Sequence, residues 1–250
     1  MVFRAACIAS AIAVTGLSAP AAASPRVAAY IAAAVADPAR PVDDRKLDPD
    51  RKPAQLLAFA QVHPGEAIAE YLPGGGYYTR MLSGIVGAKG RVFALETTTW
   101  GKDNIESTRS AITASNLGNV ALDLAPLGEF HLSAKVDLFW ITDNYHDLHV
   151  PKYANVDMAV FNSHVFNSLK PGGAYLIIDH AAAPGTGATL SPSLHRIDKA
   201  TVIAEVTAVG FKLARQSDLL HNPADDHSRT VFEPAIHFKT DQFVLLFRKP

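Results

Sequence analysis

The chain has 250 residues, of which 48% are hydrophobic, and its formal net charge is −1. This length and apolar content predict a single folded domain with a substantial core. The charge is balanced and the basic residues are scattered, which argues against nucleic acid as a partner.

The first residues have the pattern of a secretory signal. Arg4 precedes an apolar run over 5–17, and small residues follow over 18–24. The run is shorter than the roughly 20 residues that a membrane-spanning helix needs, so we expect no stable membrane anchor. We therefore expect residues 1–23 to be cleaved and the protein to be exported, to the periplasm or beyond. The only cysteine, Cys7, lies in this segment, which leaves the mature chain without a thiol.

Residues 24–62 are predicted to form an N-terminal helical cap. Apolar spacing favours helices over 26–36 and 53–62, and the polar stretch 37–50 is interpreted as a link between them. We expect these two helices to pack over the edge of a sheet or over a ligand cleft.

From residue 63 to 250 strands alternate with helices. The pattern predicts strands over 67–72, 91–96, 119–124, 136–142 and 174–179, and helices after Gly76 and over 102–114, 151–169 and 197–209. This alternation is typical of a doubly wound, mostly parallel α/β sheet. Two last strands, 211–216 and 243–248, have no helix between them and are expected to form an antiparallel hairpin at one edge.

A glycine turn, Pro73–Gly76, connects the first of these strands to its helix. Open α/β sheets bind ligands at the carboxyl ends of their strands. Glycines there allow a ligand to approach the backbone, and the following helix offers free N–H groups. The alternative is a tight connection that merely needs positive φ angles.

Glu96 ends the second strand, where an acid can accept hydrogen bonds from the ribose hydroxyls of a nucleoside cofactor. A nicotinamide dinucleotide would require G-x-G-x-x-G/A, but Thr79 occupies the last position, and Tyr77 and Tyr78 crowd the place of a pyrophosphate. S-adenosylmethionine has no phosphate and tolerates this bulk. The alternative for Glu96 is a solvated strand end.

Several motifs together resemble class I S-adenosylmethionine-dependent methyltransferases, and most closely an exported bacterial branch known only as predicted methyltransferases. They are Pro73–Arg80, Asn144–Leu148, Leu169–Gly173, Leu194–Asp198, Asn222–His227 and Thr240–Phe243. The resemblance implies a Rossmann-like, seven-stranded sheet in the order 3-2-1-4-5-7-6 with an antiparallel last strand. It also implies S-adenosylmethionine as cofactor, held by Glu70, Pro73, Gly74, Gly75, Gly76 and Glu96. One position departs from the family: Leu72 stands where the first glycine of the turn belongs, and we expect it to narrow or remodel the pocket.

The resulting hypothesis is an exported methyltransferase that acts on a small molecule. The alternative, favoured by Leu72 and by the signal, is a non-enzymatic protein whose methyltransferase fold binds another ligand. A nicotinamide oxidoreductase is disfavoured by Thr79, and a serine hydrolase by the lack of a G-x-S-x-G elbow.

The candidate catalytic residues are Asn144, His146 and Asp179, which follow or end the fourth and fifth strands. With an ordinary pKa of about 6.5, His146 suits the role of a base that deprotonates the methyl acceptor, and Asp147 could orient its ring. The alternative is that Asn144 and Asp147 cap the next segment and His146 is a packed loop residue.

A metal site is an alternative to these roles. Loops could bring six side chains together, namely His146, Asp147, Asp179, His180, His195 and His227. However, no H-x-x-x-H or H-E-x-x-H pairing occurs, and such pairs usually mark these sites. The sequence therefore favours hydrogen-bonded histidines and no metal.

Overall fold

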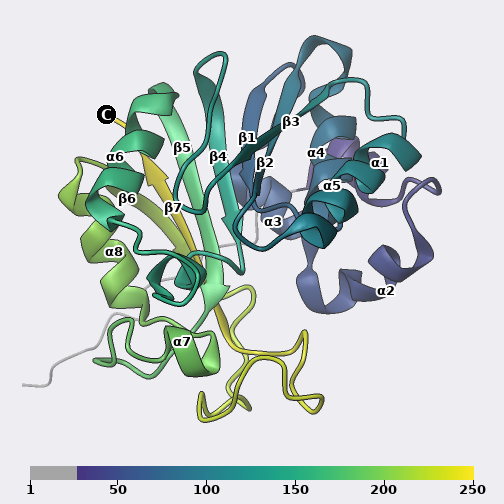
Figure 1. Ribbon diagram of the computed structural model, residues 1–250. Helices are drawn as coiled ribbons and strands as arrows, with labels where there is room; N and C mark the ends of the chain where they lie inside the picture. The colour runs from purple at the N-terminus through teal and green to yellow at the C-terminus, as the bar shows by residue number, and fades with distance from the viewer. Residues whose placement is uncertain (1–26) are drawn as a thin grey trace, which may run out of the picture.

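The computed structural model describes residues 27–250 (Figure 1). The predicted signal, residues 1–23 with Cys7, lies outside the described residues. Within the described part, no helix combines the length and the apolar character needed to cross a bilayer.

One seven-stranded sheet organises the chain, in the order β3-β2-β1-β4-β5-β7-β6. Its strands are β1 Ala67–Tyr71, β2 Arg91–Thr97, β3 Val120–Ala125, β4 Val136–Thr142, β5 Leu169–His180, β6 Lys212–Ser217 and β7 Gln242–Arg248. β7 is antiparallel to both of its neighbours, and the pairings among β1 to β5 are parallel. The strand order implied by the resemblance and the expected antiparallel pair are thus confirmed.

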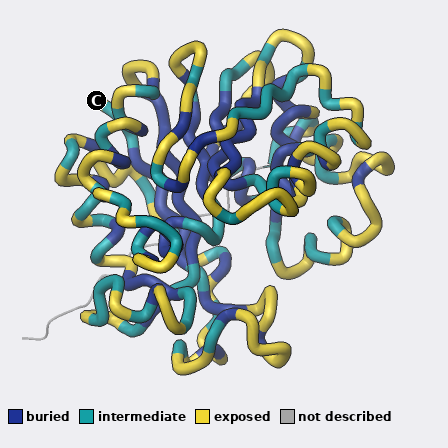
Figure 2. The backbone as a smooth tube through the Cα atoms, in the orientation of Figure 1, coloured by how far each residue is buried: buried dark blue, intermediate teal, exposed yellow. Residues whose placement is uncertain are grey.

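Helices cover both faces of the sheet (Figure 1). They are α1 Ala29–Val35, α2 Val42–Arg51, α3 Pro53–Ala60, α4 Tyr77–Val86, α5 Lys102–Ala114, α6 Met158–Ser168, α7 Ser191–Leu194 and α8 Lys199–Ala208, with short 3₁₀ turns η1 Gly87–Lys89 and η2 His146–His149. Successive residues of β4 point to opposite faces: Phe139 packs in the core under α6 and α8, and Trp140 in the core under α1, α3 and α4. Because both faces are covered, the central strands are almost entirely apolar and buried (Figure 2).

The interpretation of 37–50 as a link was wrong, because α2 occupies most of it. Pro49 lies inside this helix and removes one backbone hydrogen-bond donor. A proline in this position usually breaks a helix, so the sequence pattern predicts an irregular segment here. Asp43 and Asp44 in the first turn and Arg51 in the last suit the helix dipole. Side-chain ion pairs to Arg40 and Arg80 then hold the helix in place. Tertiary contacts outweigh local propensity here.

Two boundaries around the fifth strand were also misplaced. α6 begins at Met158 rather than at 151, where the side chain of Asp157 accepts hydrogen bonds from the N–H groups of Ala159 and Val160. β5 begins at Leu169, the last residue of the predicted helix 151–169, and the strand includes the two glycines that follow. Gly172 and Gly173 exchange backbone hydrogen bonds with Lys249, which extends the pairing with β7.

The carboxyl ends of the parallel strands point to one edge of the sheet, at the bottom of Figure 1. α7 and the long connection between β6 and β7 lie beyond this edge. α1 packs against α3 and α4, whereas α2 contributes Asp44, Leu47 and Arg51 to a cavity at the edge. Among the N-terminal helices, α1 therefore packs against the helices that cover one face of the sheet, and α2 borders the cleft.

Candidate active site

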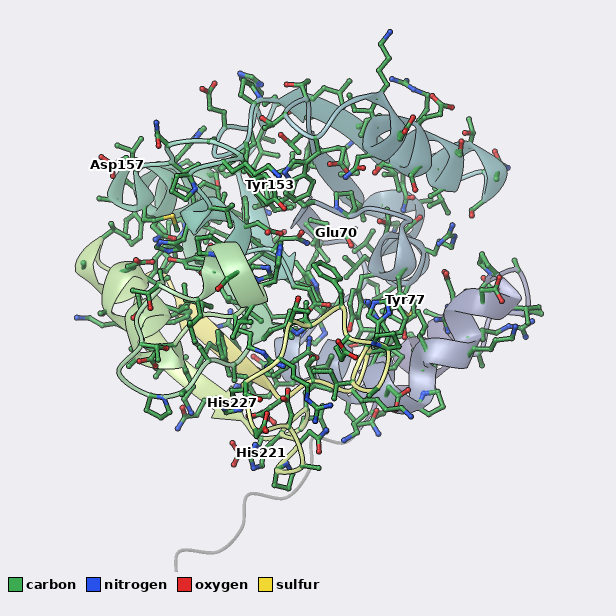
Figure 3. The ribbon with its side chains drawn as sticks, turned by 60° about the horizontal axis from the view of Figure 1, so that its bottom comes forward. Glu70, Tyr77, Tyr153, Asp157, His221 and His227 are labelled. Carbon is green, nitrogen blue, oxygen red and sulfur yellow. The ribbon has the colours of Figure 1, made fainter. Side chains whose placement is uncertain are left out.

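Two adjoining cavities open at the carboxyl edge. The glycine-turn cavity, of about 400 Å³, is lined by residues 70–75 and by Glu96. The histidine cavity, of about 430 Å³, is lined by His146, Asp147 and His195. Five residues belong to both walls: Arg51, Trp100, Asn104, Asp143 and Asn144. Figure 3 looks toward this edge, with Glu70 near the middle between Tyr153 and Tyr77.

The glycine turn presents bare backbone to the first cavity. A Cβ atom placed on Gly74 or Gly75 would meet nothing within 4 Å, so both residues border open space. Gly76 differs, because its Cβ would lie 2.8 Å from Ala111 Cβ of α5, and its φ is +77°. Gly76 is thus required for packing, whereas Gly74 and Gly75 leave room for a ligand. Pro73 also lines the cavity.

Leu72 takes the conformation that a glycine would supply. Its φ is +56°, and its N–H donates a 2.8 Å hydrogen bond to the Leu95 carbonyl oxygen. The side chain is only 6% exposed and packs in the core with Tyr71 and Phe93. The expected remodelling is therefore limited, since the turn keeps its shape and a cavity remains beside it.

Two buried carboxylates border the glycine-turn cavity. Glu70 accepts a 2.6 Å hydrogen bond from Thr79 Oγ1, and burial raises its pKa to about 7. Glu96 accepts hydrogen bonds from the Thr97 N–H (2.8 Å) and from Thr108 Oγ1 (2.7 Å), and burial raises its pKa as well. A carboxylate has about four acceptor positions, so Glu96 can accept further hydrogen bonds from a ligand. Glu96 is thus a buried hydrogen-bond acceptor whose carboxylate is fixed by Thr97 and Thr108, and not a solvated strand end.

Sequence reasoning missed four of the five residues of the shared wall, namely Arg51, Trp100, Asn104 and Asp143. Arg51 reaches from the end of α2, with its Nη2 3.7 Å from Asp143 Oδ2. The indole N–H of Trp100 is buried without a hydrogen-bond partner. Neither Arg51 nor Trp100 belongs to a motif, and only the path of α2 and of the loop after β2 brings them to the cleft.

His146 is held by Asp179 from behind. The carboxylate lies 2.7 Å from His146 Nδ1 and also accepts the His146 backbone N–H at 2.7 Å. Asp179 is fully buried and lines neither cavity, so it is a positioning residue. Burial opposes charge on the His146 ring, but Asp179 and Asp147 raise its pKa to about 10. The ordinary pKa on which the expected base role depends does not hold here.

The other candidates divide between the cavities and the surroundings. The Asn144 side chain donates a 2.6 Å hydrogen bond to the Thr142 carbonyl oxygen, and the residue lies in the shared wall. His180 Nδ1 lies 2.7 Å from Thr240 Oγ1, and burial lowers its pKa to about 3. His227 bonds Asp241 on the far side of the edge, away from both cavities (Figure 3). The six metal candidates thus do not form one cluster: His146, Asp147 and His195 lie together, Asp179 and His180 belong to a second group, and His227 joins neither.

Known proteins match this chain in structure only. The sequence matches no protein-family model and no curated protein. A SAM-dependent methyltransferase from Aquifex aeolicus superposes with a TM-score of 0.58 at 18% identity, covering 84% of this chain and 99% of its own. The chain has the class I methyltransferase fold. A putative sarcosine dimethylglycine methyltransferase from Galdieria sulphuraria gives 0.58 at 16% identity, covering 84% and 88%. The [4+2]-cyclase SpnF gives 0.58 at 14% identity, covering 83% and 80%.

In this methyltransferase fold the strand order reverses between β1 and β4. Open α/β sheets bind their ligands at such a switch point. The Leu72 and Asn144 loops that follow these two strands border the cleft. The two cavities thus lie where the topology of the sheet predicts a binding site.

Proposed function

We propose that this protein is an S-adenosylmethionine-dependent methyltransferase that acts on a small molecule. The observation that carries the proposal is the pairing of open backbone at Gly74 and Gly75 with the buried acceptor Glu96 in one cavity. The backbone offers a close approach to the methionine part of the cofactor, and Glu96 can accept the ribose hydroxyls.

The charges around the glycine-turn cavity suit this cofactor. S-adenosylmethionine carries a positive sulfonium, a positive ammonium and a negative carboxylate. The cavity wall offers the acids Glu70, Glu96 and Asp143 to the positive groups, and Arg51 to the carboxylate. The unpartnered Trp100 N–H supplies a further donor. The fit rests on both the shape and the polarity of the wall.

The histidine cavity is the proposed acceptor site. When bound, S-adenosylmethionine supplies an electrophilic methyl group, so the protein's main task is to align the acceptor for in-line displacement. The cavity volume of about 430 Å³ suits a small molecule. Trp100, Tyr153, Phe232 and Phe238 give this cavity aromatic walls that favour an acceptor with an apolar or planar part. Asn144, in the shared wall, is placed to contact both ligands.

Calorimetric titration with S-adenosylmethionine tests the proposal. We expect binding in the wild type and an affinity about 100-fold lower in Glu96→Ala, because two hydrogen bonds to a charged acceptor are lost. Glu96→Gln, which keeps the shape, should fall between them. Glu106→Ala on the exposed side of α5 is the matched control and should bind like the wild type. A wild type that gives no heat at millimolar cofactor would sink the proposal.

A second candidate is a protein of this fold with another ligand or another reaction. Two observations favour it: Leu72 replaces a glycine of the turn, and the similar SpnF structure is a [4+2]-cyclase. The fold alone does not fix the reaction. Cofactor binding without methyl transfer to any member of a small-molecule library would favour this candidate.

We also propose that the protein is exported after cleavage near Ala23, on the strength of the N-terminal pattern. Cell fractionation followed by mass determination tests this. Export predicts a shortened chain outside the cytoplasm, and a full-length chain confined to the cytoplasm would refute it.

A further inference from the structure

Three ligand-type atoms meet in the wall of the histidine cavity. His146 Nε2 lies 3.3 Å from Asp147 Oδ1 and 3.2 Å from His195 Nδ1, and the last two atoms are 3.2 Å apart. His146 and Asp147 come from η2, and His195 follows α7, 49 positions after His146. The three atoms form a nearly equilateral triangle, and all three residues line the cavity.

Hydrogen bonds leave this triangle incomplete. Asp147 is only 7% exposed, and its Oδ1 accepts no hydrogen bond although it lies within ion-pair distance of both ring nitrogens; the one hydrogen bond within the triangle joins His146 Nε2 and His195 Nδ1. An unpaired buried carboxylate oxygen is costly. Asp179 engages Nδ1 of His146, so the other ring nitrogen, Nε2, is turned toward the triangle. An oxygen without a hydrogen bond and a ring nitrogen directed at it form an arrangement that suits a cation.

We propose that His146, Asp147 and His195 bind a divalent transition-metal ion. Ligand atoms about 2.0–2.2 Å from one ion lie about 2.8–3.6 Å from each other in tetrahedral positions or in adjacent octahedral positions, and the three observed separations fall in this range. Two imidazoles with one carboxylate are a donor set for zinc or iron(II), whereas magnesium and calcium prefer oxygen ligands alone.

The surroundings of the triangle are those of a built metal site. Asp179 holds the ring of His146 through its second nitrogen, an arrangement that fixes ring orientation in metal-binding histidines. His195 has a left-handed backbone, with φ +55°, and its ring packs against the edge of Phe232. His195 is thus directed at the triangle by backbone conformation and by packing.

A second group of ligand-type atoms gives weaker support for a metal site. It consists of Asp143, Asp179 and His180. Its members already have partners: Gln242 donates to Asp143, Asp179 holds His146, and His180 bonds Thr240. The proposal is therefore confined to the first triangle.

Three protein ligands leave coordination positions for water or for another donor. Among the described residues, no further histidine or carboxylate joins the triangle. An ion there would bind an oxygen or nitrogen atom of a molecule in the histidine cavity. That this molecule is the methyl acceptor rests on the proposed function, but the metal site itself does not.

The test titrates Zn²⁺ into the full chain after chelator treatment and dialysis, in the absence of S-adenosylmethionine. We expect one ion per chain, and at least about 100-fold weaker binding in Asp147→Asn and in His195→Asn, beyond what loss of an outer hydrogen-bond partner costs. Asparagine tolerates the left-handed backbone at position 195. Cobalt(II) should give visible absorption bands in the wild type that both variants lose.

His227→Asn is the matched control. His227 also has a positive φ (+62°) and an aspartate partner, but it lies outside the triangle. It should bind Zn²⁺ like the wild type. Circular dichroism melting identifies any variant that fails to fold, and cofactor titration of the metal-free protein tests the methyltransferase proposal separately. The metal site is overturned if the wild type takes up no ion, if both triangle variants bind like the wild type, or if only the control loses binding.

Discussion

Leu72 combines a backbone conformation that disfavours it with a side chain that the core requires. A left-handed conformation costs a non-glycine residue about 1–2 kcal/mol, whereas truncating a buried leucine costs about 2–5 kcal/mol. We predict that Leu72→Gly lowers the free energy of unfolding by about 1–3 kcal/mol, because relief of strain offsets part of the loss. Urea denaturation measures this.

Leu72→Ala separates the two contributions. It removes the same packing but keeps a Cβ at φ +56°, so it should be less stable than Leu72→Gly by about 1 kcal/mol. If the alanine variant proves the more stable of the two, the turn does not impose the left-handed conformation. Cofactor titration of the glycine variant shows in addition whether the leucine narrows the pocket.

Glu70 makes stability depend on pH. Burial raises its pKa to about 7 in the folded protein, against an ordinary value near 4.5. The folded state therefore binds the proton more tightly, and this group's contribution to the free energy of unfolding falls as pH rises from about 4.5 to 7, by about 3 kcal/mol. Above pH 7 the contribution is constant.

We predict that Glu70→Gln removes this part of the pH dependence. Relative to the wild type, the variant should gain about 3 kcal/mol between pH 4.5 and pH 8 in denaturation experiments without cofactor. Glu106→Gln, at an exposed site on α5, should show no such gain. Parallel curves for wild type and Glu70→Gln would mean that the carboxyl group is not buried in solution.

For individual residues, the sequence predicted the location of the site better than the chemical role of each residue in it. Glu70, Glu96 and the glycines were predictable because the position of a turn or strand end follows from local pattern. The partners Thr79 and Thr108, and the convergence of His195 on His146, depend on how separate segments pack. The pKa of His146 follows from burial beside two carboxylates, which spacing along the chain does not encode.

Among the elements, α2 shows why local pattern fails. Pro49 and a polar composition suggest a link, but Asp48 binds the buried guanidinium of Arg40 through both oxygens, at 2.7 and 2.8 Å, and accepts the Tyr77 hydroxyl at 2.6 Å. Asp44 binds Arg80 of α4. The helix is fixed by partners outside itself and so stays at the rim of the glycine-turn cavity. The strands, by contrast, were predictable because a strand that is buried on both faces consists almost entirely of apolar residues.

We predict that Asp48→Ala lowers the free energy of unfolding by about 2–3 kcal/mol. Breaking a fully buried ion pair costs about 3–5 kcal/mol, and the Asp48 side chain keeps 22% exposure. Asp43→Ala is the matched control in the same helix, because its pair with Lys46 is exposed and should contribute little to stability. Equal effects of the two variants in urea denaturation would show that α2 is not anchored through Asp48.

At the scale of the whole molecule, one sheet with a core on each face supports a cleft of two halves. Arg51, Trp100, Asn104, Asp143 and Asn144 form the partition between them. The glycine-turn cavity takes its form from β1, β2 and α2, and the histidine cavity from η2, from His195 after α7 and from the connection between β6 and β7. Because the two halves share only these five residues, a substitution at any other wall residue of one half leaves the wall of the other half in place.

This arrangement predicts that cofactor and metal stabilise the fold additively. A ligand at 100 times its Kd adds about 2.7 kcal/mol to the free energy of unfolding. For a chain of this size that raises Tm by about 5–10 °C. We expect S-adenosylmethionine and Zn²⁺ each to give such a shift, and both together to give roughly the sum. Glu96→Ala should lose only the cofactor shift and Asp147→Asn only the metal shift. A combined shift no larger than either alone would show that the two ligands compete for one site.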